Sequence, residues 1–179
     1  MSATGRGMHA LARHTSTPTT AVRRVDAAAI LGDRGALGLR YVLAADMARI
    51  AVPQPRAPRR ADGLWRHTCF ECFVRGRGSA YVEFNFSPSG EWAAYAFNAY
   101  REPAPLPAAF DPRIAVSVSA DALEVVANVS AAALPRAPTM RIGLSAVLEE
   151  TSGAITYWAL RHAPGKPDFH HADAFALEV

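Results

Sequence analysis

Residues 64–100 hold most of the chain's aromatic side chains in three extended runs. A glycine-rich break at residues 76–78 separates the first run from the second, and the turn Ser-Pro-Ser-Gly at residues 87–90 separates the second from the third. Proline presets φ in such a turn and glycine accepts left-handed geometry. The stretch therefore predicts a strand followed by a hairpin in which Ser87 pairs with Gly90.

The register of this hairpin decides which side chains share a face, because side chains alternate along a strand. The predicted register puts a polar and aromatic set on one face: Tyr81, Glu83, Asn85, Trp92, Ala94 and Asn98. The other face is predicted to belong to the core and carries Val82, Phe84, Phe86, Ala93, Tyr95 and Phe97.

The rest of the chain repeats a pattern of short apolar runs and turns. Residues 37–44 alternate with a period of two, which is typical of a strand. Further runs of β-branched and aromatic residues lie at residues 114–119, 123–129, 140–150 and 155–162. Because the order of these runs lacks a βαβ rhythm, the sequence predicts an all-β protein, an antiparallel β-sandwich of jelly-roll type.

The length of 179 residues suits one domain that needs no disulfide or metal to fold. Residues 1–20 are polar, small and without periodicity, so we expect a flexible N-terminal segment before a single domain over residues 21–179. No run approaches the roughly 18 apolar residues that span a bilayer. Residues 1–20 also lack the apolar region of a signal peptide. These features predict a cytoplasmic protein without a membrane partner.

The basic residues are dispersed along the sequence. The formal net charge is +3, yet only Arg56, Arg59 and Arg60 gather, within a proline-rich segment. Dedicated nucleic-acid binders show a denser basic stripe in a recognisable motif. We therefore expect a solvated loop here and no nucleic-acid partner.

Strand alternation also predicts a candidate ligand surface. On residues 64–75 it places an indole and a carboxylate on one side, which we expect to continue onto the polar face of the hairpin. The combined surface carries Trp65, Glu71, Glu83, Asn85 and Trp92. Such a surface suits a sugar, because a pyranose ring stacks on an indole while its hydroxyls need polar partners. In the alternative interpretation the tryptophans fill the core and Glu83 faces water.

Cys69 and Cys72 form a C-x-x-C motif, which occurs in redox and zinc sites. Positions three apart on a strand point to opposite faces, so the two sulfurs diverge. The sequence has no second C-x-x-C to complete a zinc site. We therefore expect buried, free thiols.

The sequence gives weaker signals for a metal and for haem. Four residues of metal-ligand type lie within six positions, in what is alternatively a surface loop: Asp168, His170, His171 and Asp173. Candidate axial ligands for haem are Met47, Met140, His67 and His162, and the absence of C-x-x-C-H excludes covalent attachment. We expect no cofactor, with haem b as the alternative.

Catalytic motifs are sparse. Neither G-x-S-x-G nor H-E-x-x-H occurs. Glu71 and Glu83 form a candidate carboxylate pair of the kind that glycosidases use, although two acidic residues in a sheet are common. We therefore predict a protein that is not an enzyme.

Three segments together resemble the bacterial DOMON-like proteins: LWRHTCFECFV, YVEFNFSPSGEWAAYAFNAYRE and YWALRHAPGKPDFHHADAF. The resemblance extends over residues 20–179, and the DOMON-like fold is similar to that of family 9 carbohydrate-binding modules. It implies a β-sandwich that binds a ligand, which is a sugar in some relatives and haem in others.

The resemblance also implies roles for individual residues. Family 9 modules hold a sugar between two tryptophans with help from a carboxylate, an amide and an arginine. Trp65 and Glu71 match the first tryptophan and the carboxylate, and Asn85 matches the amide. Arg101 matches the arginine and Trp158 the second tryptophan, across loops of different length. The haem-binding branch uses Met and His ligands, onto which no residue here maps.

The function predicted from the residues and the resemblance is non-enzymatic binding of a small carbohydrate or sugar derivative. Tryptophan stacking and hydrogen bonds from carboxylates and an amide would hold the ligand. The alternatives are a haem-binding electron-transfer domain and a structural or interaction module.

Overall fold

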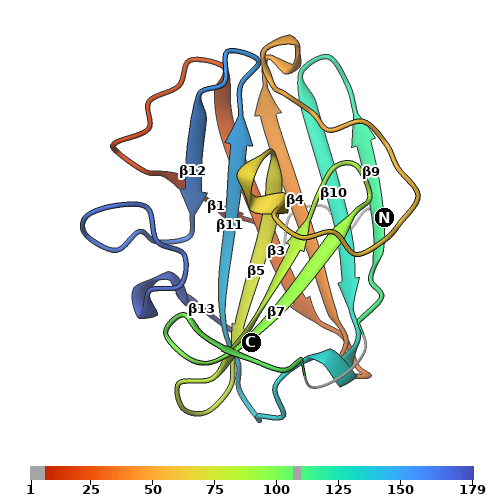
Figure 1. Cartoon of the computed structure of the whole chain (residues 1–179), viewed down its shortest axis with the longest axis vertical. Coiled ribbons are helices and arrows are strands. Elements are labelled where there is room, and N and C mark those ends of the chain that lie inside the picture. Colours follow the sequence, from red (N-terminus) through yellow and green to blue (C-terminus); the bar gives the residue numbers. More distant parts are fainter. Residues whose placement is uncertain (1–6, 107–109) are drawn as a thin grey trace.

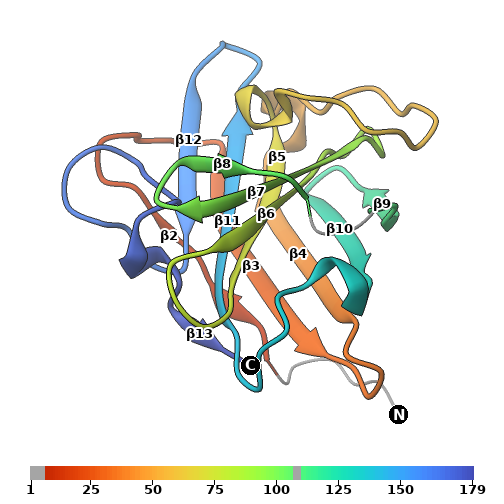
Figure 2. The ribbon, with the colours of Figure 1, turned by 60° about the horizontal axis from the view of Figure 1, so that its bottom comes forward.

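Two antiparallel sheets packed face to face make up the part of the chain that the structure describes, residues 7–106 and 110–179 of a computed structural model. Figures 1 and 2 show the two sheets lying one over the other. The prediction of an all-β, antiparallel sandwich is confirmed. Helical structure in the described residues is limited to four 3-10 turns: η1 (Met47–Arg49), η2 (Leu64–Arg66), η3 (Ala131–Ala133) and η4 (Ala172–Ala174). None of these described helices has the length and hydrophobicity to cross a membrane.

The smaller sheet has five strands in the described residues, in the order β1-β3-β4-β10-β9. Their bounds are β1 (His9–Ala10), β3 (Val22–Leu31), β4 (Leu37–Ala45), β10 (Ala122–Val129) and β9 (Arg113–Val118). In β4 the odd-numbered residues are buried and the even-numbered ones are partly exposed. This sheet therefore buries one face in the core and leaves the other toward solvent, as its period-two pattern predicts.

The larger sheet has eight strands in the described residues, in the order β2-β12-β11-β5-β6-β7-β8, with β13 paired to β11. Their bounds are β2 (Ala12–Arg13), β12 (Ile155–Ala159), β11 (Arg141–Glu149), β5 (Cys69–Arg75), β6 (Tyr81–Phe86), β7 (Trp92–Ala99), β8 (Glu102–Ala104) and β13 (Leu177–Glu178). β5 and β6 are buried along almost their whole length, on both faces.

Both faces of the larger sheet carry apolar clusters. The inner face packs on the smaller sheet and contributes Phe70, Cys72, Phe84 and Phe86 to the main core. The outer face carries a second cluster, in which Phe73 and Tyr81 of the sheet meet Phe169 and Phe175 of the C-terminal segment. The C-terminal segment therefore covers part of the outer face, and the rest of that face is left for a pocket.

The hairpin between β6 and β7 differs from the prediction by one residue. The backbone N–H of Ser87 donates to the carbonyl oxygen of Glu91 at 2.9 Å, and that of Gly90 donates to Ser87 at 3.0 Å. The turn therefore closes on Glu91 instead of Gly90. Gly90 still has the left-handed backbone that the sequence predicts, with φ of 91°.

This extra residue exchanges the two faces of β7, because side chains alternate with a period of two. Trp92 pairs with Phe86 and points into the main core. Tyr95 pairs with Glu83 on the outer face, and Phe97 joins the outer cluster. The predicted faces of Trp92, Ala93, Ala94, Tyr95 and Phe97 are therefore wrong, and the predicted faces of the β6 residues are confirmed. Asn98 lies at an irregularity between Phe97 and Ala99, so this register does not assign its face.

The predicted flexible segment also differs from the structure. β1 pairs with β3 in the smaller sheet, and β2 pairs with β12 in the larger one. The prediction of flexibility is therefore wrong for residues 9–13, and residues 1–6 lie outside the described part. Such two-residue strands form because the edge strand of a sheet has unpaired backbone N–H and C=O groups. A side-chain pattern in the sequence does not predict this pairing.

Candidate functional site

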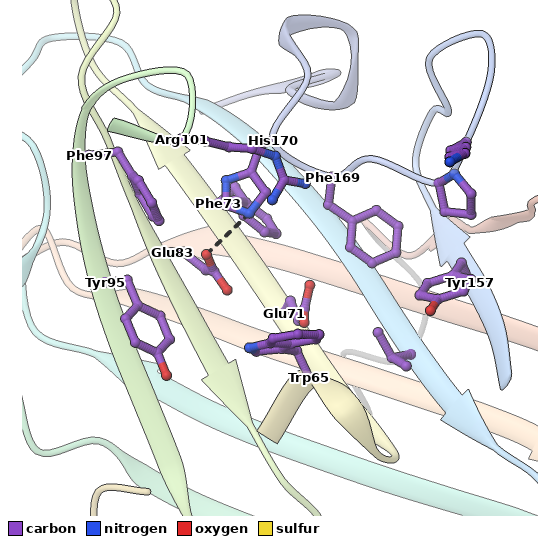
Figure 3. A pocket seen from close by; sticks show the side chains of 13 residues that line it. Trp65, Glu71, Phe73, Glu83, Tyr95, Phe97, Arg101, Tyr157, Phe169 and His170 are labelled. Carbon is purple, nitrogen blue, oxygen red and sulfur yellow. Dashed lines mark ion pairs between the residues drawn. The ribbon is translucent and has the colours of Figure 1, made fainter. Parts of the chain in front are cut away.

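A pocket of about 580 Å³ opens on the outer face of the larger sheet (Figure 3). Its residues come from β5, β6, β7, β11 and β12, from η2, and from the loops that carry Arg101 and residues 166–170. They are Trp65, Glu71, Phe73, Glu83, Tyr95, Phe97, Arg101, Val147, Tyr157, Lys166, Pro167, Phe169 and His170. Small-molecule sites typically have volumes of roughly 300 to 1,000 Å³, so the pocket has a suitable size.

Sheet register brings two carboxyl groups together in this pocket. β5 and β6 pair Glu71 with Asn85 and Phe73 with Glu83, so the two glutamates occupy diagonal positions on one face. Figure 3 shows both carboxyl groups directed into the pocket. The prediction that Glu71, Glu83 and Asn85 share a face is confirmed by the register. Their part in binding stays a prediction.

Both carboxyl groups are buried, with 2% of Glu71 and 5% of Glu83 exposed. Burial, reinforced by the charge of Glu83, raises the pKa of Glu71 well above its usual range. Burial also raises the pKa of Glu83 to about 7, against the lowering effects of a hydrogen bond from Asn85 and the charge of Arg101. The pair therefore favours retention of a proton near neutral pH, and an opposite charge in the pocket would favour ionisation of both groups.

His170 is fixed beside Glu83 by a chain of hydrogen bonds. The backbone N–H of Arg101 donates to the Tyr81 hydroxyl at 3.1 Å, and this hydroxyl lies 2.7 Å from Nδ1 of His170. Burial and the charge of Arg101 lower the pKa of His170 to about 4, so the imidazole is neutral at neutral pH. When the Tyr81 hydroxyl donates to Nδ1, the imidazole proton resides on Nε2. Nε2 lies 3.6 Å from Oε2 of Glu83, and this contact is not an ion pair at neutral pH because the imidazole is neutral.

Arg101 is held at the pocket by Asp168. Its guanidinium donates to Oδ1 of Asp168 at 3.0 Å, while the Tyr100 hydroxyl donates to Oδ2 at 2.7 Å. These two hydrogen bonds hold the pKa of Asp168 below its usual range although burial alone would raise it. Among the described residues other than glycine, only Arg101 has a positive φ, 54°. Such backbone strain persists where surrounding contacts fix it.

Trp65 lines the pocket from the turn η2 and not from a strand. The turn η2 directly follows Gly63, whose φ of 76° is left-handed and is readily adopted by glycine. Trp65 remains 48% exposed, and the guanidinium of Arg66 lies 5.2 Å from the centre of its ring. The predicted strand over residues 64–68 is wrong, but the large exposed indole lies where a ligand can stack on it.

The other two candidate tryptophans lie in the main core. Trp92 packs edge to face on Phe110 with ring centres 5.1 Å apart. The indole N–H of Trp158 donates to the Thr156 hydroxyl at 2.9 Å. Neither is among the pocket residues, so their predicted ligand-facing positions are wrong. The neighbour of Trp158 in the strand, Tyr157, points to the opposite face and lines the pocket instead.

Several pocket residues were missed by sequence reasoning. Tyr95 and Phe97 were assigned to the core because of the one-residue difference in the turn. The alternation of β12 contained a signal for Tyr157, since a core tryptophan beside it implies an outward tyrosine. Lys166 and Phe169 lie on a loop, whose path no periodicity predicts.

The four metal-ligand candidates do not converge on one point. Asp168 and His170 take part in the pocket hydrogen bonds described above, whereas His171 and Asp173 form an exposed pair 3.6 Å apart at η4. Within residues 7–106 and 110–179, no three His, Cys, Asp or Glu residues form a group that could hold a metal ion.

The haem-ligand candidates lie away from the pocket residues. Met47 and Met140 belong to the main core. Nδ1 of His67 lies 2.7 Å from Oε2 of Glu149, and Nε2 of His162 lies 2.8 Å from the backbone carbonyl oxygen of Ala12 in β2. None of the four is among the described residues that line the pocket.

Cys69 and Cys72 are buried and free, as predicted. They occupy positions on opposite faces of β5, and Cys72 belongs to the main core. Burial raises the pKa of both thiols, which keeps them protonated.

Comparison with known proteins places the fold. No family sequence model and no curated protein matches this chain. A proposed carbohydrate-binding protein from Bacteroides uniformis matches it with a TM-score of 0.65 at 15% identity, over 93% of this chain and 83% of the other. A family 9 carbohydrate-binding module from Caldicellulosiruptor kristjanssonii, in complex with glucose, matches with a TM-score of 0.61 at 11% identity, over 91% and 78%. The chain shares their fold.

A family 9 module from the same organism in complex with cellotriose gives a TM-score of 0.59 at 10% identity, over 88% of this chain and 74% of the other. At these identities the likeness concerns the fold. Membership of the DOMON-like proteins stays a prediction.

Proposed function

We propose that this protein is a non-enzymatic binding protein that holds a small carbohydrate in the outer pocket. The observation that carries the proposal is the presence, in one pocket, of an exposed indole, Trp65, and two buried carboxyl groups, Glu71 and Glu83. The fold supports it, because structures that share this fold include modules in complex with glucose and cellotriose.

Each part of the pocket offers what a sugar ring requires. The face of Trp65 can stack on the C–H patch of a pyranose, and Tyr95, Tyr157 and Phe169 supply further apolar wall. The carboxyl groups accept hydrogen bonds from hydroxyls, and Arg101 donates. An aromatic contact contributes on the order of 1 kcal/mol beyond area burial, so we expect modest affinity for a monosaccharide.

We propose that the carboxyl pair binds the ligand and has no catalytic role, because the structures that share this fold are described as carbohydrate-binding proteins and modules. Turnover of an aryl glycoside that is lost in Glu71→Gln would contradict this part of the proposal.

Titration with a sugar panel tests the proposal. Isothermal calorimetry or ligand-observed NMR with hexoses and short oligosaccharides should detect a binder. Its affinity should fall about tenfold in Trp65→Ala, since one stacking contact is lost. Ile30→Ala is a matched control, because Ile30 is also exposed but lies on β3 of the other sheet. A binder whose affinity is unchanged in Trp65→Ala, or the absence of any binder, would refute the proposal. A Soret band after mixing with haem would favour the haem alternative.

A further inference from the structure

The two pocket carboxyl groups differ from the other buried carboxylates of this protein. Glu91 and Glu150 are each 8% exposed, and each forms an ion pair with an arginine. Glu91 pairs with Arg59 at 2.7 Å, and Glu150 pairs with Arg49 at 3.4 Å. Glu71 and Glu83 are more deeply buried. Among the described residues, neither forms an ion pair with an arginine or a lysine. A buried carboxylate is costly without an opposite charge, so a cation bound beside the pair would stabilise its ionised form.

The pair also lacks hydrogen-bond donors. Glu71 accepts one long hydrogen bond, from Ser145 at 3.4 Å, and Glu83 accepts one from the amide of Asn85 at 2.9 Å. Oδ1 of Asn85, another acceptor, is buried without a partner. A further donor, Nε2 of His170, is 3.6 Å from Glu83. A ligand group that fits this surplus of acceptors carries several N–H donors and a positive charge, as an alkylammonium does.

Aromatic side chains surround the carboxyl pair: Trp65, Phe73, Tyr95, Phe97, Tyr157 and Phe169. In the view of Figure 3, Trp65 is drawn beside Glu71, and Tyr95 and Phe97 lie on the side of the pocket where Glu83 is drawn; all five residues line the pocket. Ring faces attract ammonium groups, and the attraction grows when the cation is desolvated. Aromatic faces around unpaired carboxyl groups thus suit an ammonium better than they suit an anion.

No arginine or lysine of the described residues forms an ion pair with Glu71 or Glu83, although the charge of Arg101 acts on Glu83 from a distance. Arg101 is engaged by Asp168 at 3.0 Å. Lys166 is the chain's only lysine, and it forms no ion pair with the described residues. The other titratable side chains that line the pocket are His170, Tyr95 and Tyr157. None of these supplies a cation in contact with the carboxyl pair.

We propose that the pocket selects a carbohydrate that carries a protonated amine, and that the amine lies between Glu71 and Glu83. This inference rests on the proposed function and adds the class of sugar. In the free protein the pair retains a proton; a bound ammonium allows both carboxyl groups to ionise. The displaced proton leaves to solvent, so binding is coupled to proton release.

Matched ligands test the inference in the intact chain. The probes are glucosamine, galactosamine and mannosamine, each compared with its neutral parent hexose and with its N-acetyl derivative by calorimetry at about pH 6.5, below the pKa of Glu83. We expect an amino sugar to bind roughly 10- to 100-fold more tightly than its two neutral counterparts, because charged hydrogen bonds are added. Repeating the titration in buffers of different ionisation enthalpy should show release of up to about one proton per ligand.

Glutamine variants separate charge from shape. Glu71→Gln and Glu83→Gln keep the side-chain size and should each reduce the preference for the amino sugar to a few-fold. Both variants should also reduce the proton release, because each removes one of the two carboxyl groups that share the proton. Glu124→Gln is the matched control, because Glu124 lies on β10 of the other sheet. It should leave both the preference and the proton release unchanged.

Two non-sugar ammonium compounds, choline and ethanolamine, separate failure of the inference from failure of the proposed function. A neutral hexose that binds as tightly as its amino counterpart would overturn the inference and leave carbohydrate binding intact. Choline or ethanolamine binding as tightly as the best amino sugar, with no binding of neutral sugars, would support the ammonium site and overturn carbohydrate binding. Absence of binding by all of these probes would overturn the inference.

Discussion

Folding changes the protonation of Glu83 and His170 in opposite directions, and the pH dependence of stability should reveal both changes. In the unfolded chain at about pH 5.5, a glutamate is ionised and a histidine is protonated. In the folded protein, burial raises the pKa of Glu83 to about 7 and lowers that of His170 to about 4, so both are neutral at that pH. Folding therefore moves one proton from the imidazole to the carboxyl group and changes the total number of bound protons little.

The two groups affect stability in opposite directions as pH changes. Glu83 contributes stability that is fully present below its unfolded pKa of 4.5 and is lost as pH rises through about 7. His170 contributes stability that is fully present above its unfolded pKa of 6.5 and is lost as pH falls through about 4. Each pKa is displaced by about 2.5 from its ordinary value, which corresponds to about 3 kcal/mol per group. In the native protein the two effects largely cancel between about pH 4.5 and 6.5.

Single substitutions should expose each effect. In Glu83→Gln only the effect of His170 remains. The free energy of unfolding of this variant should therefore rise by about 3 kcal/mol between about pH 4 and 6.5, compared with that of the native protein over the same range. In His170→Gln only the glutamate effect remains, and stability should fall by about 3 kcal/mol from about pH 4.5 to 7. The double variant should regain a profile parallel to that of the native protein, because other titrating groups are common to all four.

Urea unfolding at a series of pH values measures these profiles, and the fluorescence of the buried Trp92 and Trp158 reports the transition. Linear extrapolation gives the free energy of unfolding for the native protein and the three variants. A Glu83→Gln profile parallel to the native one would refute the reasoning, since it would show that Glu83 is not protonated by burial. It would also remove the electrostatic basis of proton release on ligand binding.

Other expected outcomes concern packing. Trp92→Ala should destabilise the fold by about 3 to 5 kcal/mol in urea unfolding, whereas Trp65→Ala should change stability by less than about 1 kcal/mol, because only the former removes core packing. Cys69 and Cys72 should resist a thiol reagent in the native protein and react on unfolding; rapid native reaction would contradict their burial. Gly143→Ala should destabilise the protein, because the added Cβ would lie 3.0 Å from a backbone oxygen of the C-terminal segment. An unchanged midpoint would show that this segment moves away freely.

Sequence patterns predicted much of the fold and part of the site. The alternation in β4 and β6 identified strands and the faces of their side chains, because burial on one face acts on every second residue. The same rule placed Glu71, Glu83 and Asn85 together. It failed at β7, because the face of that strand depends on the number of residues in the turn. A Ser-Pro-Ser-Gly sequence identifies a turn but leaves open whether Gly90 or Glu91 closes it.

The amino-acid sequence by itself determined the fold class, the faces of β6 and the opposed positions of the two cysteines, since each follows from a local period of two. Only the tertiary structure decided which aromatic residues line the pocket. Trp92 and Trp158 pack in the core, while Tyr95 and Tyr157 face outward. Loop residues such as His170 reach the pocket through contacts between segments distant in sequence. The pKa values of the glutamates likewise arise from tertiary burial, because desolvation depends on everything packed around a charge.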